Sequence, residues 1–330
     1  MNILFFSAQP YDKTYFTKAN VSHQYNLRFL DYPLNADNTA LVKPGETVVC
    51  AFVNDKLDAT VLTQLKERGV ELIALRAAGF NNVDLKTAAA LNIPVVRVPA
   101  YSPHAVAEHA VALLMAVNRK ICKAYNRVRE SNFTLNGLEG FDIFGKTVGV
   151  IGTGNIGSVF CKIMLGFGCR VLANDLYPNE SLQQAGVQYV DVDTILQESD
   201  IISLHCPLTP ETKHLINEKT IASSKKGVVI INTSRGGLID TKAVVEALKN
   251  GHIGALGIDV YEQEEHLFFQ DLSGVIIQDD VWARLTTFPN VLITSHQGFF
   301  THEALTQIAE TTLNNIAKFA NKEPLTNQVI

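Results

Sequence analysis

Short apolar runs alternate with amphipathic segments along most of the chain, and this pattern predicts buried strands separated by helices. In the first hundred residues the strand-like runs are Asn2–Phe6, Thr47–Phe52, Glu71–Leu75 and Pro94–Val98. Helical spacing fills gaps between them at Asp58–Arg68 and Asp84–Leu91. Near-continuous apolar strands with intervening helices are typical of a parallel sheet covered on both faces.

A second series of the same kind follows. Its expected strands are Thr147–Ile151, Arg170–Asn174, Ile201–His205, Gly227–Asn232, Ala255–Val260 and Val291–Thr294. Helices are expected at Asn155–Phe167 and Thr241–Asn250, and Gly251 fits a helix stop. The pattern predicts an α/β protein with two doubly wound parallel-sheet domains.

Two helices are expected to join these domains. Ser102 fits an N-cap and Pro103 the first helical position of a long amphipathic helix over Ser102–Glu130. A further helix at Thr301–Phe319 is expected to return to the first domain. We therefore expect one domain at residues 1–100 and 298–330, a second at 101–297, and an active-site cleft between them.

Composition narrows the class of protein. With 330 residues, 47% hydrophobic and 18% charged, the chain is typical of a soluble globular protein of two domains. A net charge of -5 and a pI near 6.0 give no electrostatic footprint for nucleic acid. No apolar run is long enough to span a bilayer, and the N-terminus lacks the features of a signal peptide. The five cysteines form no CxxC pair, which favours reduced thiols in the cytoplasm over disulfides or metal ligands.

The segment Gly152–Gly157 is a G-x-G-x-x-G that follows one expected strand and opens an expected helix, the context of a dinucleotide site. Gly152 would allow the tight turn, Gly154 the approach of a pyrophosphate, and Gly157 close helix packing. Asp175, 18 residues after Gly157, could accept hydrogen bonds from the ribose hydroxyls and would repel a 2′-phosphate. We therefore predict that the domain binds NAD rather than NADP.

Three separated residues could complete a ketone-reducing site. Arg235 follows a strand and is suited to gripping a carboxylate through two N–H groups. His296 follows the last strand and could donate a proton to a carbonyl oxygen. A carboxylate bonded to that histidine would keep it protonated, and Glu262, Glu264 and Glu265 are equal candidates on physical grounds.

The segments GKTVGVIGTGNIG, LHCPLTPETKHLIN, NTSRGGLID, GALGIDVYEQE and TSHQGF resemble the D-isomer-specific 2-hydroxyacid dehydrogenase family. The pieces AFVNDKLD, LIALRAAGFNNVDL and VVRVPAYSPHAVAEHA are similar to its bacterial D-lactate dehydrogenase branch. The resemblance runs nearly end to end. It implies a flavodoxin-like substrate domain, a Rossmann NAD-binding domain, and reversible reduction of pyruvate to D-lactate.

The same resemblance implies roles for individual residues. It makes Arg235 the substrate-carboxylate binder, His296 the acid/base, and Glu264 its partner. Substrate contacts are implied at Ala78, Gly79 and Tyr101. Cofactor contacts are implied at Asn155, Ile156, Asp175, Cys206, Pro207, Thr212, Thr233, Ser234, Arg235 and Asp259, with no metal. Family members are typically homodimers through the nucleotide-binding domain, and a higher oligomer is the alternative.

Some lactate-type relatives carry Tyr where this chain has Phe52 and Phe299, so the preferred chain length is left open. These two side chains and Tyr101 are expected to wall a small apolar pocket. A bulkier 2-keto acid such as 2-ketoisocaproate or phenylpyruvate, or the smaller glyoxylate, is the nearer alternative substrate. A non-catalytic NAD-sensing scaffold is the alternative of another class, because fold alone does not prove turnover.

Overall fold

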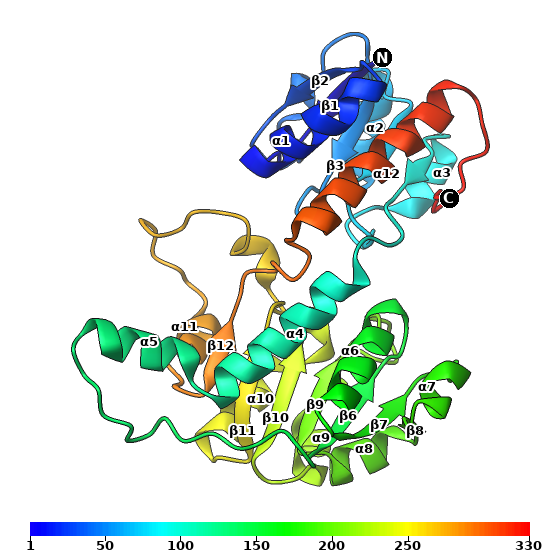
Figure 1. The fold of residues 1–330 in the computed structure, drawn as a ribbon. Coiled ribbons are helices and arrows are strands. Elements are labelled where there is room, and N and C mark those ends of the chain that lie inside the picture. Colours follow the sequence, from blue (N-terminus) through cyan, green and yellow to red (C-terminus); the bar gives the residue numbers. More distant parts are fainter. The chain divides into compact units, whose positions relative to one another are not determined.

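A computed structural model describes all residues from Met1 to Ile330. The chain forms two compact units, each built on its own sheet (Figure 1). Unit 1 comprises Met1–Ser102 and Phe300–Ile330, and unit 2 comprises Pro103–Phe299. The predicted α/β class with two doubly wound parallel sheets is confirmed. No helix has both the length and the apolar character that crossing a membrane requires.

Unit 1 has a five-stranded parallel sheet in the order β2-β1-β3-β4-β5, the flavodoxin-like arrangement. Its strands are β1 (Asn2–Phe5), β2 (Asn26–Phe29), β3 (Glu46–Ala51), β4 (Leu72–Leu75) and β5 (Val95–Val96). Its helices are α1 (Pro10–Ala19), α2 (Ala59–Glu67), α3 (Leu85–Ala90) and α12 (His302–Ala320), with 3₁₀ turns η1 (Asn20–Ser22) and η2 (Thr39–Leu41). Helix α12 packs against α1 and β4.

Unit 2 has a seven-stranded parallel sheet in the order β12-β11-β10-β9-β6-β7-β8, which contains the Rossmann arrangement. Its strands are β6 (Thr147–Ile151), β7 (Arg170–Asn174), β8 (Gln188–Tyr189), β9 (Ile201–Leu204), β10 (Val228–Asn232), β11 (Ile253–Ile258) and β12 (Val291–Ile293). The order reverses between β6 and β9, and ligands of open α/β sheets bind outside the strand ends at such a point.

Helices cover both faces of the unit 2 sheet. The helices of unit 2 are α4 (Pro103–Asn118), α5 (Ile121–Arg129), α6 (Asn155–Gly166), α7 (Glu180–Gln184), α8 (Val192–Glu198), α9 (Glu218–Ser223), α10 (Thr241–Lys249) and α11 (Asp280–Thr286), with 3₁₀ turns η3 (Gly236–Leu238) and η4 (Glu264–His266). Helix α5 contacts α4 and buries no residue. Polar side chains cap many helices by accepting a backbone N–H bond, as at Asp58, Asp84, Asp191, Asn217, Asp240, Asp279 and Thr301.

Alternation along the central strands divides the core of unit 2 into two layers. In β10, Val229 and Ile231 join the cluster that contains Phe160 of α6, while Val228 and Ile230 join the cluster on the other face. Strands buried on both faces have continuous apolar sequences, and for this reason they could be predicted from the sequence.

The expected single helix over Ser102–Glu130 is wrong, because α4 ends at Asn118 and α5 begins at Ile121. Lys120 between them adopts the left-handed conformation (φ 52°), which an α-helix cannot continue through. The buried Asn118 side chain donates to Phe141 O at 2.8 Å and accepts from Phe141 N at 3.0 Å, so the end of α4 is tied to a distant segment. Helix α1 and strands β2 and β8 were also not predicted from the sequence.

Candidate active site

The glycine turn Gly152–Gly157 lies between β6 and α6, as predicted. Gly152 has φ 94°, and a Cβ there would lie 2.5 Å from Cys206 N in the segment after β9. A Cβ on Gly157 would lie 1.9 Å from Gly152 O. Both positions therefore require glycine, because the backbone of the turn packs directly on the start of α6 and on the neighbouring strand end.

Gly154 differs from these two glycines, because a Cβ there would meet nothing within 4 Å. It is the N-cap of α6 and no side chain caps this helix end, so the amide groups of Asn155 and Ile156 at the start of the helix lie beside open space. Uncapped amides and the positive end of the helix dipole suit a pyrophosphate. The residues present therefore fit a dinucleotide.

Asp175 lies just beyond β7 and faces the glycine turn. Its Oδ2 accepts hydrogen bonds from Thr153 N at 2.5 Å and Thr153 Oγ1 at 3.2 Å, and its Oδ1 accepts from Tyr177 N at 2.9 Å. The carboxylate thereby fixes the turn and keeps further lone pairs for donors such as ribose hydroxyls. Its negative charge at this point would disfavour a phosphate ester.

Other expected cofactor residues line the strand ends after β9 and β10. Ser234 Oγ donates to Cys206 O at 2.7 Å, and Thr212 Oγ1 donates to Pro207 O at 2.7 Å, so these groups brace the two loops. Thr233 is 8% exposed, and its buried Oγ1 has no hydrogen-bond partner in the protein. An unpartnered buried hydroxyl at this edge fits a bound ligand.

His205 directly follows β9 and is a second candidate for the group that donates a proton to the substrate. Its ring packs on Phe160 with centroids 4.9 Å apart, and its Nε2 lies 2.8 Å from Ser203 Oγ. Burial lowers the pKa of His205 to about 3. The ring is therefore neutral at neutral pH and is not the proton donor.

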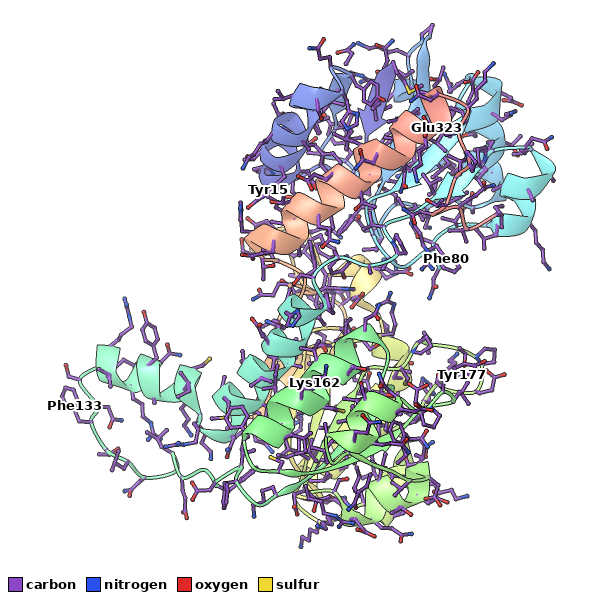
Figure 2. The ribbon with its side chains drawn as sticks, turned by 45° about the vertical axis from the view of Figure 1, so that its right-hand side comes forward. Tyr15, Phe80, Phe133, Lys162, Tyr177 and Glu323 are labelled. Carbon is purple, nitrogen blue, oxygen red and sulfur yellow. The ribbon has the colours of Figure 1, made fainter.

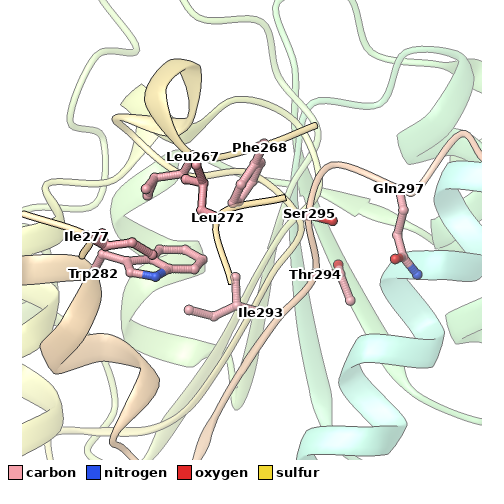
Figure 3. Close-up of a pocket in the computed structure, with 9 residues that line it drawn as sticks. All are labelled: Leu267, Phe268, Leu272, Ile277, Trp282, Ile293, Thr294, Ser295 and Gln297. Carbon is pink, nitrogen blue, oxygen red and sulfur yellow. The ribbon is translucent and has the colours of Figure 1, made fainter. Parts of the chain in front are cut away.

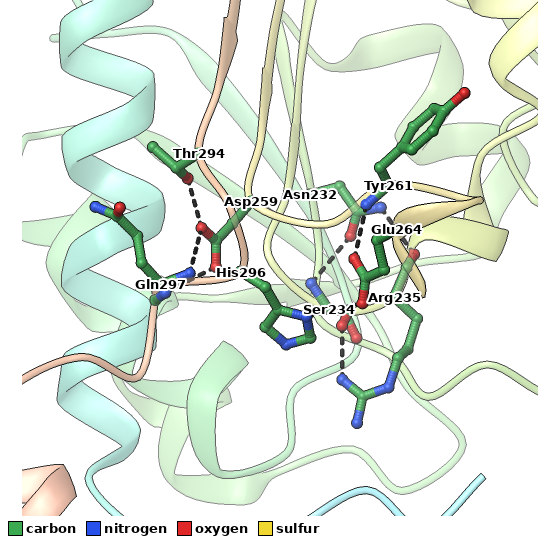
Figure 4. A network of polar contacts seen from close by, with 10 residues as sticks. Asn232, Ser234, Arg235, Asp259, Tyr261, Glu264, Thr294, His296 and Gln297 are labelled. Atoms are coloured by element: carbon green, nitrogen blue, oxygen red, sulfur yellow. Dashed lines mark hydrogen bonds and ion pairs between the residues drawn. The ribbon is translucent and has the colours of Figure 1, made fainter. Parts of the chain in front are cut away.

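Arg235 follows β10 in a loop that is stabilised by hydrogen bonds of Asn232. The fully buried Asn232 donates from Nδ2 to Arg235 O at 2.9 Å and accepts from Ser234 N at 3.0 Å. A Cβ on Gly236 would lie 2.1 Å from Tyr261 C, so this glycine permits close packing of the loop on the backbone at Tyr261. The guanidinium is half-buried and donates from Nη1 to Ser234 O at 2.7 Å (Figure 4).

Glu264 and His296 come together, although 32 residues separate them. His296 Nδ1 lies 2.8 Å from Glu264 Oε1, and the two side chains are 20% and 21% exposed (Figure 4). Glu264 Oε2 accepts from Tyr261 N at 2.9 Å, so both carboxylate oxygens are fixed. Glu262 instead bonds His214 Nε2 at 2.6 Å, and Glu265 is exposed. Among the three glutamates that were equal candidates on the sequence alone, Glu264 is therefore the one that pairs with His296.

Asp259, at the end of β11, organises the segment that carries His296. Its Oδ1 accepts from Thr294 Oγ1 at 2.5 Å and Gln297 N at 2.9 Å, and its Oδ2 accepts from Gly298 N at 2.7 Å. His109 Nε2 lies 3.2 Å from Oδ1. Burial alone would raise the pKa of Asp259, but the hydrogen bonds from His109 and Thr294 hold it below its ordinary value.

The backbone of Asp259 acts directly on the histidine. Asp259 O accepts from His296 N at 2.7 Å, and His296 adopts φ 54°, a left-handed conformation that costs an L-residue roughly 1–2 kcal/mol. This conformation turns the imidazole out of the line of β12. The resemblance implied only a cofactor contact for Asp259, whereas its role in positioning His296 follows from these backbone bonds.

The expected substrate residues are divided between the units. Ala78 and Gly79 lie half-buried in the bend after β4, and their amide groups donate to no protein acceptor. Phe52 in unit 1 and Phe299 in unit 2 are each 8% exposed, and Tyr101 is half-buried in unit 1. Two free amides in one bend are suited to binding a carboxylate.

A pocket of about 350 Å³ lies in unit 2 beside the segment that bears His296 (Figure 3). Its walls are largely apolar: Leu267, Phe268, Leu272, Ile277, Trp282 and Ile293, with Thr294, Ser295 and Gln297 at one side. None of these side chains transfers a proton at neutral pH. The pocket is therefore not the site of the chemistry.

The Rossmann sheet with its glycine turn, and the histidine–carboxylate pair at the strand ends, define a nucleotide-dependent oxidoreductase. Residues 111–298 match the family model described as "D-isomer specific 2-hydroxyacid dehydrogenase, NAD binding domain". The D-lactate dehydrogenase of Escherichia coli is 52% identical over 330 residues, covering 100% of both chains. The 2-hydroxyacid dehydrogenase homolog 1 of Schizosaccharomyces pombe is 55% identical over 98% of this chain and 97% of its own.

A solved structure titled as the pyruvate reductase of Chlamydomonas reinhardtii superposes with a TM-score of 0.94 at 45% identity, covering 99% of this chain and 98% of its own. The chain belongs to the D-isomer-specific 2-hydroxyacid dehydrogenase family, and its cofactor is NAD.

The open space at Gly154 allows a direct check of the expected pyrophosphate site. We expect Gly154→Ala to weaken NADH binding by at least about tenfold, because a methyl group would project where the pyrophosphate lies. The thermal midpoint of the cofactor-free protein should stay close to the wild-type value, since no protein atom is displaced. Fluorescence titration with NADH and calorimetry measure the two quantities.

Gly166→Ala, at the other end of α6 and equally free of neighbours, is the matched control and should leave NADH affinity unchanged. Unaltered affinity in Gly154→Ala would place the pyrophosphate elsewhere.

Proposed function

We propose that this protein is an NAD-dependent D-lactate dehydrogenase that reversibly reduces pyruvate to D-lactate. The observation that carries the proposal is the pairing of His296 with Glu264 at 2.8 Å, on the strand-end edge that also bears Arg235. Relatives named for D-lactate and for pyruvate reduction support the choice of substrate.

Reduction of a ketone to an alcohol requires a hydride at the carbonyl carbon, which NADH supplies, and a proton at the oxygen, which the protein must provide. With His296 Nδ1–H donating to Glu264, the imidazolium Nε2–H is the group left to give that proton. The Glu264 carboxylate stabilises the protonated ring and fixes its orientation. In the oxidation of lactate the neutral ring takes the same proton back.

The substrate carboxylate requires its own binding groups. We propose that the guanidinium of Arg235 holds it, together with the amides of Ala78 and Gly79. In this proposal Phe52, Tyr101 and Phe299 surround the substrate's methyl group and exclude water. Exclusion of water strengthens the interaction of Arg235 and His296 with the developing oxyanion.

We also propose that the protein is a homodimer formed through α5 and the segment that follows. Large apolar side chains there are each at least 55% exposed: Ile121, Tyr125, Val128, Phe133, Leu135 and Phe144. Figure 2 shows Phe133 on a segment that projects away from the sheet of its own unit. So large an exposed apolar set is unusual for a monomer, and a second copy with two-fold symmetry would bury it.

The five cysteines are all free thiols, as expected for a reducing compartment, and we propose a cytoplasmic location on that ground.

The proton role can be tested at His296. We expect His296→Gln to lower turnover with pyruvate by roughly 10²–10⁴-fold, the usual scale of general acid catalysis, while NADH affinity is retained. Glu264→Gln should lower turnover as well, because the imidazolium loses its charged partner. Steady-state kinetics with a parallel NADH titration separate these effects.

Glu265→Gln is the matched control, since this exposed neighbour lies outside the pair and should behave like the wild type. Near-normal turnover in His296→Gln would remove the histidine from the chemistry.

The dimer is tested with a matched pair of valines. We expect Val128→Glu to halve the mass measured by light scattering at micromolar concentration, because it places charge in the proposed apolar interface. Val21→Glu in unit 1, at an isolated site that is 76% exposed, should leave the mass unchanged. A Val128→Glu protein of unaltered mass would contradict this interface.

A further inference from the structure

Arg76 is the largest fully buried side chain of the protein, and no role was predicted for it from the sequence. It lies directly after β4, is 1% exposed, and precedes Ala78 and Gly79 by two and three residues. A buried guanidinium cannot lose its proton, so its charge has to be compensated within unit 1.

Backbone carbonyls accept hydrogen bonds from this cation and one carboxylate forms an ion pair with it, although Nε itself has no hydrogen-bond partner. Arg76 Nη2 donates to Phe6 O and Ser7 O, both at 2.8 Å, and Nη1 donates to Cys50 O at 3.4 Å. Its Nε lies 3.3 Å from Oδ1 of the buried Asp12. The acceptors belong to β3 and to the segment after β1. One side chain directly after β4 therefore ties together the carboxyl ends of β1, β3 and β4, next to the reversal of strand order between β1 and β3.

Phe52 is held by the same cluster. The guanidinium carbon of Arg76 lies 4.9 Å from the centre of the Phe52 ring, within the range of a cation–π contact. The buried Asp55 accepts from Phe52 N at 2.6 Å, and also from Ser7 Oγ and Leu34 N at 2.7 Å. The backbone and the ring of Phe52 are thus fixed by two different buried charges.

Packing alone does not require a charged group at this place. Apolar residues of similar volume often replace buried ion pairs at no cost in stability, whereas a planar guanidinium supports an aromatic face in one orientation. The segment bearing Phe52 and the bend with the free amides of Ala78 and Gly79 both begin at strand ends that Arg76 joins.

We propose that Arg76 is a positioning residue that determines substrate chain length, by holding the Phe52 ring as a rigid wall beside the substrate's side chain. This inference rests on the proposed function, because it takes Phe52 to contact the keto acid. Loss of the flat cation beneath the ring would let Phe52 move and admit larger substrates, while the groups that transfer the proton stay as they are.

The test is the ratio of kcat/KM for pyruvate to kcat/KM for phenylpyruvate. We expect Arg76→Lys to lower this ratio by about 5- to 10-fold, within the range that one hydrophobic wall controls. Phe52→Leu should lower it similarly, and the double variant should fall no further than either single one, because both changes act on one wall. Arg28→Lys, which alters another paired arginine of unit 1, should leave the ratio unchanged.

If Arg76→Lys lowers the thermal midpoint but leaves the ratio of the two kcat/KM values at the wild-type level, the role of Arg76 is structural only and the proposal is overturned. Additive effects in the double variant overturn it too, because Arg76 would then act through another group. If Arg76→Lys does not fold, Asp12→Asn loosens the same guanidinium and should lower the ratio to a smaller degree; an unchanged ratio there counts against the proposal. A wild-type protein that reduces neither keto acid would instead overturn the proposed function.

Discussion

The buried carboxylate of Asp259 fixes the segment on which the chemistry depends. Its two oxygens gather the Thr294 hydroxyl and the amides of Gln297 and Gly298, and its carbonyl oxygen holds the amide of His296. These bonds keep His296 in a left-handed conformation that the local chain would not adopt unaided. From that position the imidazole reaches Glu264, whose other oxygen is anchored on Tyr261 N.

A similar logic governs the two strand-order reversals. In unit 2, Gly152 brings the turn after β6 against the backbone at Cys206, and the start of α6 keeps uncapped amides beside open space at Gly154. In unit 1, the side chain of Arg76 reaches from the end of β4 to the strand ends at the reversal and contacts Phe52. Glycines form the turn at the reversal in unit 2, whereas the buried and compensated charge of Arg76 lies at the reversal in unit 1.

Much of this could be predicted from the sequence. Strands buried on both faces have a continuous apolar signature, and the glycine spacing identified the cofactor turn. The break between α4 and α5 could not be predicted, because it depends on a left-handed Lys120 and on the pairing of Asn118 with the distant Phe141. The choice of Glu264 among three acids likewise depends on a contact between segments far apart in the chain.

The internal contacts of Arg76 and Asp259 could not be predicted from the sequence, for a shared reason. Each is a charged residue at the end of an apolar run, and in sequence such residues indicate a loop or a ligand contact. Their actual partners are backbone groups of other strand ends, which local patterns do not reveal. A charged residue directly after a strand can therefore indicate hydrogen bonds to the backbone of neighbouring strand ends as well as ligand binding.

The most direct measurement is the consumption of NADH by the purified protein with pyruvate, followed by chiral analysis of the lactate formed. The account predicts catalytic turnover and D-lactate as the only isomer. Tight NADH binding without consumption, or formation of L-lactate, would contradict it.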